Sequence, residues 1–304
     1  MSFGQSFLRN PDLFPARSAG EPWGDRELVL DLPGGPYGFS GLSADQEETA
    51  LARFGDLRLS SEAAPPAVTS SVFRAAAEDF REIDTRGWEY GLDFDSGPSS
   101  VRLAGLDLTG RLDWRPALRG ALWTAVGAGD RFPGIFENFC RVLVAYRLHE
   151  LGGAVIHGAA VVDGGEALLF AGPSGAGKST VSRMALERGL ALLSDDLNAL
   201  LPAPGGAILA GLPFTGDLGD GGGPRARYPL RALLRLEKDT EDRLRPLGRA
   251  EAAACLLACS PFVNADPGRH AALLATLLDL MDGVPAYALR FSLTGRMWSI
   301  LPTA

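Results

Sequence analysis

Residues 172–179 read GPSGAGKS and match the phosphate-binding pattern G-x-x-x-x-G-K-[ST] at every fixed position. Glycines let the chain turn tightly enough to point successive backbone N–H groups at phosphate oxygens. The Lys178 ammonium offers a positive charge to the β- and γ-phosphates, and the Ser179 hydroxyl is a ligand for Mg²⁺. The pattern predicts a nucleotide site made by Gly172, Pro173, Ser174, Gly175, Ala176, Gly177, Lys178, Ser179 and Thr180.

The surrounding sequence has the strand–loop–helix order that such a loop requires. Residues 167–171 (ALLFA) form a short apolar run, as a buried parallel strand does. A helix is expected to begin near Lys178, where its positive end adds to the anion site, and to stop at Gly189. The alternative is a glycine-rich turn without a ligand, which this context disfavours.

Two adjacent carboxylates follow the next apolar run. Residues 190–196 read LALLSDD, which predicts a buried strand with Asp195 and Asp196 at its carboxyl end. Ligands of open α/β sheets lie at that end of the strands, so both acids are expected beside the loop. One carboxylate could hold Mg²⁺ and the other could accept the proton of an attacking hydroxyl. The alternative is that they cap a following helix.

His157 interrupts an apolar strand predicted at residues 154–162, which a hairpin turn at residues 163–165 joins to the run before the loop. A single histidine in an apolar strand is usually a core residue. Because the hairpin is tight, His157 could instead lie near the sheet end that carries the acids. The residues alone leave both interpretations open.

The segment resembles the catalytic domain of HPr serine kinase/phosphorylase over residues 156–200, through the IHG strand, the hairpin, GPSGAGKST and LLSDD. ABC-type ATPases would show an LSGGQ-like stretch, and guanine-binding proteins an NKxD stretch. Shikimate- and gluconate-type kinases end the second strand in D-x-D and lack the His-Gly hairpin. The resemblance implies the P-loop kinase fold shared with phosphoenolpyruvate carboxykinase.

The resemblance also implies roles for individual residues. Lys178 and Ser179 would bind nucleotide phosphate and Mg²⁺, and Asp195 would be the base that takes the proton of a serine hydroxyl. Asp196 would be the metal acid, and His157 would interact with Asp195 and tune its protonation. The family often forms hexamers or smaller rings, which implies a homo-oligomer. Unaligned candidates for its dephosphorylation and docking residues are Asn264, Arg269, Arg290 and Arg296.

Composition restricts the class of protein. A net charge of −8 and a pI near 5.0 disfavour a nucleic-acid partner. No apolar run approaches the roughly 18 residues that span a membrane, and no signal-peptide core opens the chain. The three cysteines indicate a reducing compartment, so we expect a cytoplasmic protein. Cys255 and Cys259 share a helix face and are expected to pack in a core.

The 304 residues suggest two domains. We predict a smaller, strand-rich auxiliary α/β domain at residues 1–115 and the P-loop catalytic domain at residues 116–304. Half-buried strands are expected at residues 26–32 and 88–94, two strands within residues 100–114, and a helix from a Ser43–Gln46 capping box. The auxiliary domain could bind a partner or substrate, or only stabilise the catalytic domain.

The second half contains three more predicted features. Residues 136–151 have the spacing of an amphipathic helix, and residues 249–259 and 270–281 are helical by pattern. Residues 288–291 and 297–301 are predicted as closing strands. Residues 216–227 are flexible by composition and end in Arg225 and Arg227, as in a lid that clamps a phosphate or in a plain surface loop.

These patterns predict an ATP- and Mg²⁺-dependent kinase that transfers the γ-phosphoryl group to a hydroxyl. The acceptor suggested by the resemblance is a serine of a protein or peptide. The alternatives are a kinase of a small molecule, such as free serine or a sugar, and a nucleotide-binding regulatory module with little catalysis. No nucleic-acid or membrane partner is expected.

Overall fold

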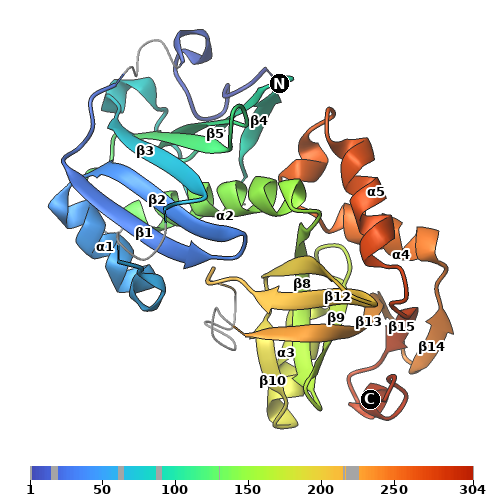
Figure 1. Cartoon of the computed structure of the whole chain (residues 1–304). Helices are drawn as coiled ribbons and strands as arrows, with labels where there is room; N and C mark the ends of the chain where they lie inside the picture. Colours follow the sequence, from blue (N-terminus) through green and yellow to red (C-terminus); the bar gives the residue numbers. More distant parts are fainter. Residues whose placement is uncertain are drawn as a thin grey trace. The chain divides into compact units, whose positions relative to one another are not determined.

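The computed structural model describes residues 2–14, 20–60, 65–86, 91–129, 131–214, 216 and 226–303. It is a mixed α/β protein with two sheets and five α-helices in these residues (Figure 1). The chain divides into two compact units, Met1–Arg147 and Leu148–Ala304. No helix in the described residues is both long and apolar enough to cross a membrane.

The first unit contains a seven-stranded sheet in the order β1-β2-β3-β7-β6-β5-β4. The β2–β3 and β3–β7 pairs are parallel and the other pairs are antiparallel. The strands are β1 (Arg26–Leu32), β2 (Gly35–Leu42), β3 (Val68–Arg74), β4 (Asp93–Ser96), β5 (Ser100–Gly105), β6 (Leu108–Asp113) and β7 (Arg119–Thr124). Part of the strand predicted at residues 88–94 lies outside the described residues.

Two helices belong to this unit. Helix α1 (Ala44–Phe54) begins with the predicted capping box, in which Ser43 and Gln46 satisfy each other's backbone N–H groups. Helix α2 (Phe132–Glu150) packs through Phe136 against Phe39 of β2 and Phe54 of α1.

The border between the units falls in the last turn of α2, whereas the sequence prediction set it at residues 115/116. The difference has a physical reason. Strand β7 completes the first sheet, and Phe139 and Leu143 of α2 lie so close to Gly120 of β7 that a Cβ atom there would meet both.

The second unit is built on an eight-stranded sheet. Its strands are β8 (Ala154–Asp163), β9 (Glu166–Ala171), β10 (Ala191–Ser194), β11 (Leu197–Ala203), β12 (Gly206–Gly211), β13 (Arg227–Lys238), β14 (Arg243–Pro246) and β15 (Ala286–Phe291). Strand β8 pairs antiparallel with β9, β10 and β11, and β13 pairs parallel with β9 and β15. The 3₁₀ turn Arg296–Ser299 occupies part of the strand predicted at residues 297–301, so that prediction was wrong.

Five of these strands form a closed circuit of pairings: β8 with β11, β11 with β12, β12 with β13, β13 with β9, and β9 with β8. The long strands β8 and β13 make this possible because each pairs with different partners along its length. Strand β9 is therefore paired on both sides and its residues Ala167–Ala171 are buried. The pairing of β9 with β8 and β13 therefore holds the first residue of the following loop in a defined position.

Three helices belong to the second unit: α3 (Lys178–Glu187), α4 (Arg249–Ala258) and α5 (His270–Leu280). Helix α3 packs Val181 and Ala185 into a core shared with Leu168 and Phe170 of β9. Helices α4 and α5 lie side by side (Figure 1).

Candidate active site

The loop between β9 and α3 is a compact turn held from within. The Ala176 N–H donates to the Pro173 carbonyl at 3.1 Å, and helix α3 begins at Lys178, as the sequence predicts. Gly177 has φ 110° and lies so close to Phe291 that a Cβ atom would come within 2.6 Å of that ring. Only glycine fits this position, because both the backbone conformation and the neighbouring side chain exclude a Cβ atom.

Lys178 folds back over this loop. Its Nζ donates to the carbonyl oxygens of Gly172 at 3.0 Å and Pro173 at 3.2 Å, and the residue is 8% exposed. Two neutral carbonyls are weaker partners for an ammonium than phosphate oxygens are. The Lys178 ammonium is therefore held at the loop, where the oxygens of a phosphate could replace the two carbonyls as its hydrogen-bond acceptors.

The strand directions bring the predicted residues to one edge of the sheet. Strand β8 runs antiparallel to both β9 and β10, and the carboxyl ends of β9 and β10 lie against the middle of β8. Ala171 at the end of β9 pairs with Gly158, Ser194 at the end of β10 pairs with Ala160, and His157 precedes them on β8. The loop, the two acids and His157 are therefore neighbours around residues 157–160 of β8.

Asp195 and Asp196 lie in the tight connection between β10 and β11. Strand β11 starts at Leu197, so neither acid caps a following helix, and that alternative is wrong. The Asp196 carbonyl accepts the Gly158 N–H at 2.9 Å, and the Asp196 N–H donates to Ser194 Oγ at 3.2 Å. These bonds fix the connection against β8.

His157 is not a core residue: its side chain is 47% exposed on an otherwise buried stretch of β8. Its Nε2 lies 3.5 Å from Asp196 Oδ1. The resemblance predicts an interaction with Asp195, the other acid, and that role stays a prediction.

Asp195 is 6% exposed and is approached closely by the backbone at Gly216. A Cβ atom on Gly216 would lie 2.1 Å from Asp195 Oδ1, far inside van der Waals contact. Residues 212–214 and 216 thus lead the chain directly past this carboxylate. Residues 217–225, with Arg225, lie outside the described residues, while Arg227 begins β13.

Asn198 is a residue of this site that sequence reasoning did not identify. It is fully buried, and its Nδ2 donates to the Gly158 carbonyl at 2.7 Å. The amide thereby ties β11 to the residue that follows His157. The sequence signal that could have identified Asn198 is its polar amide side chain within the apolar run LNALL.

The end of α4 also contacts this edge. The Cys259 carbonyl accepts the His157 N–H at 2.8 Å, and the Gly172 N–H donates to the Cys259 sulfur. Two of the residues suggested as candidates for dephosphorylation and docking, Arg269 and Arg290, instead form ion pairs with nearby carboxylates. Arg269 pairs with Asp266 at 2.7 Å, and Arg290 pairs with Glu237 at 3.2 Å and Asp239 at 3.3 Å.

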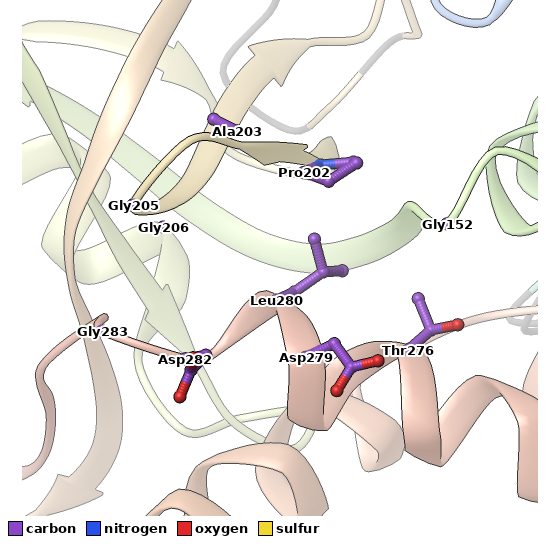
Figure 2. A pocket seen from close by; sticks show the side chains of 10 residues that line it. All are labelled: Gly152, Pro202, Ala203, Gly205, Gly206, Thr276, Asp279, Leu280, Asp282 and Gly283. Atoms are coloured by element: carbon purple, nitrogen blue, oxygen red, sulfur yellow. The ribbon is translucent and has the colours of Figure 1, made fainter.

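A separate cavity of about 350 Å³ lies between the β11–β12 turn, the end of α5 and Gly152 (Figure 2). Its carboxylates, Asp279 and Asp282, both pair with Arg249, at 3.4 and 3.3 Å. None of the predicted site residues is among the described residues that line it.

The edge of the sheet therefore combines a tight backbone loop, a cation that contacts it, two carboxylates and an imidazole. Backbone N–H groups and an ammonium can hold phosphate oxygens, and carboxylates can hold a divalent cation or take a proton. This set of groups suits the transfer of a phosphoryl group.

Comparison with known proteins gives one family and one structural likeness. A family model described as "SynChlorMet cassette protein ScmC" matches residues 136–303. A solved structure of the Hpr(Ser) kinase/phosphatase from Coxiella burnetii is similar at 13% identity and a TM-score of 0.27, covering 48% of this chain and 90% of that one. No curated protein matches.

Proposed function

This chain belongs to the SynChlorMet cassette protein ScmC family, and we propose that it is an ATP- and Mg²⁺-dependent kinase. It would transfer the γ-phosphoryl group to a hydroxyl, a serine of a protein or peptide. The observation that carries the proposal is the meeting of the phosphate loop (residues 172–177), Lys178, Asp195 and Asp196 around residues 157–160 of β8. The sequence resemblance to HPr kinases over residues 156–200 supports it.

The residues present fit a nucleotide with Mg²⁺. The loop from Gly172 to Gly177 is a narrow backbone turn in which Ala176 leaves no room for a Cβ atom at Gly172 and Phe291 leaves none at Gly177. Such a turn presents N–H groups rather than side chains to an anion. Ser179, in the first turn of α3, and Asp196 supply the oxygen ligands that Mg²⁺ prefers.

Each residue then has a separate task. Gly172 to Thr180 bind the phosphates, and Lys178 moves from the loop carbonyls to the phosphate oxygens. Asp195 accepts the proton of the acceptor hydroxyl, and Asp196 holds the metal, with His157 at 3.5 Å orienting its carboxylate. Bound Mg²⁺ supplies positive charge that offsets the negative charge gathering on the phosphates.

The family description names a cassette, so proteins and peptides encoded beside this chain are the first acceptors to examine. A peptide acceptor requires that the acid be approached by an extended chain. The backbone at Gly216 lies at that point and would have to make room for it or pair with it.

The test is transfer of labelled phosphate from ATP in the presence of Mg²⁺ to free serine, to peptides and to the co-encoded proteins. We expect the wild type to label a protein or peptide. Asp195→Asn should lower the rate by about 10²- to 10⁴-fold because it removes the base. Lys178→Ala should weaken nucleotide binding as well, and Asp282→Asn, in the separate cavity, should have no effect.

Transfer to a small molecule alone would replace the protein-kinase proposal with a small-molecule kinase. ATP binding that Lys178→Ala abolishes, with no labelling of any acceptor, would instead favour a nucleotide-binding regulatory module. An Asp195→Asn variant as active as the wild type would remove Asp195 as the base.

A further inference from the structure

The cysteine pair at the end of α4 was expected to be ordinary core. Cys255 lies in the last turn of the helix, and Cys259 is the residue just after its end. The Cys259 N–H donates to the Cys255 carbonyl at 3.2 Å, so the two residues remain one helical turn apart. A hydrogen bond also joins their side chains.

Cys259 contacts both the phosphate loop, at Gly172, and strand β8, at His157. The sulfur of Cys259 accepts the N–H of Gly172, the first residue of the loop, and its carbonyl accepts the N–H of His157 at 2.8 Å. Cys259 therefore holds the first residue of the loop and His157 of β8 in place. A displacement of Cys259 would change the hydrogen bonds of both residues.

We propose that Cys255 and Cys259 form an oxidant-sensitive modification site that controls nucleotide binding at the adjacent phosphate loop. The inference rests on the proposed function, because it assumes that the loop binds ATP. The reagent class is a peroxide.

The surroundings favour a reactive thiol at Cys259. The hydrogen bond with Cys255, followed by the Gly172 N–H and the charge of Lys178, lowers the pKa of Cys259 to about 7 although burial opposes this. The charged groups facing the pair are Lys178 from α3 and Arg235 from β13, both cationic. Thiolate is the form of cysteine that reacts with oxidants.

The third cysteine offers a contrast. Cys140 is 0% exposed in α2, and burial raises its pKa well above the usual range. Cys255 and Cys259 retain 9% and 8% exposure. The chain thus contains a matched internal control for thiol chemistry.

The reaction has two steps. The Cys259 thiolate attacks the O–O bond of hydrogen peroxide, which gives a sulfenic acid at Cys259 and hydroxide. The Cys255 thiol then attacks that sulfur, a disulfide forms and water leaves. The two sulfurs together lose two electrons, and the peroxide gains them.

The disulfide cannot form without moving the end of α4. Cβ atoms one helical turn apart are about 5–6 Å from each other, while a disulfide holds them at roughly 3.5–4.5 Å. Closing this gap draws Cys259 toward Cys255. The Gly172 N–H then loses the sulfur that accepts its hydrogen bond, and the His157 N–H loses its carbonyl partner.

The experiment titrates the full chain with hydrogen peroxide and measures ATP affinity by calorimetry before and after. Mass spectrometry of the peptide that contains both cysteines identifies the disulfide by the loss of two hydrogens. We expect ATP affinity to fall about tenfold as the disulfide forms, and dithiothreitol to restore it. Cys140→Ser should behave like the wild type, and Cys255→Ser, which keeps the oxidisable Cys259 but lacks the second thiol, should form no disulfide.

Amide exchange of the loop peptide is a second readout that needs no nucleotide. Exchange around Gly172 should rise on oxidation of the wild type and show no peroxide-dependent rise in Cys259→Ser, which lacks the sulfur that is oxidised. A disulfide that leaves both exchange and ATP affinity unchanged would overturn the inference, as would oxidation of Cys140 ahead of the pair. If the reduced protein binds no ATP, the proposed function fails, and the exchange result alone decides the cysteine site.

Discussion

At the scale of single residues, the site depends on side chains that hold other groups in place. The side-chain amide of Asn198 donates neither to the phosphate loop nor to the acids but to the Gly158 carbonyl beside His157, which it holds in place. Asp196 fixes the Gly158 N–H from the other side of the same residue. The peptide groups around Gly158 are thus held between two strands.

Asn198→Ala should destabilise the protein by about 1–3 kcal/mol, because it leaves a buried carbonyl without a donor. Urea unfolding of the two proteins measures the difference. The matched control is Asn138→Ala, which removes an equivalent 2.7 Å bond from an amide to the Gly134 carbonyl at a more exposed place. Equal effects of the two substitutions would contradict the role given to Asn198.

At the scale of elements, the site is the place where β9 and β10 end against the middle of β8. Three connections meet there: the phosphate loop, the turn that carries the two acids, and the segment from β12 that reaches Gly216. The last of these sets how much room remains in front of Asp195.

Gly216→Ala should lower phosphoryl transfer by about 10²-fold while ATP affinity stays unchanged. The new Cβ atom would lie 2.1 Å from Asp195 Oδ1, so either the segment or the carboxylate must move, and a displacement near 1 Å in a catalytic group is costly. Separate measurement of transfer rate and ATP affinity checks this.

Gly55→Ala is the control for that substitution, since nothing lies within 4 Å of a Cβ atom at that position. A Gly216→Ala protein that retains full transfer activity would show that the segment does not limit Asp195.

Several elements of both units could be predicted from the sequence because their signals are local. The capping box at Ser43, the Gly164–Gly165 turn after β8 and the start of α3 at Lys178 each follow from a few adjacent residues. The contacts of Gly216 and Cys259 could not be predicted. They join residues distant in sequence, and no local pattern reports how closely two backbones will approach.

The direction of strand pairing, parallel or antiparallel, also could not be predicted from the sequence. The apolar run before Asp195 was expected to be a buried strand that ends beside the loop, with no partner strand predicted. It does end at that edge, through the antiparallel pairing of β10 with β8. The same apolar pattern suits both arrangements, because period and hydrophobicity do not encode the partner strand.

At the scale of the whole molecule, the pH dependence of stability should include His149. Burial, and then the charge of Arg269, lower the pKa of His149 from 6.5, although Asp266 acts in the opposite direction. Its Nδ1 is buried without a hydrogen bond. The folded state therefore favours the neutral imidazole.

A lowered pKa gives a definite sign to this effect. The stabilisation is fully present above the unfolded value of 6.5 and is lost as the pH falls through the folded value, because the unfolded chain binds the proton more readily. The free energy of unfolding of the wild type should decline from pH 8 to pH 5. His149→Gln should reduce that slope, and urea unfolding across this range measures it. An unchanged slope would mean that other groups dominate.

The closed circuit of strands has a consequence for synthesis of the chain on the ribosome. Strand β9 leaves the ribosome just after β8, but its other neighbour, β13, begins only at Arg227. Until then one side of β9 has no partner and its backbone groups are unpaired. A nascent chain that stops before β13 should therefore bind nucleotide poorly at the proposed site, and binding should appear only after β13 has been made.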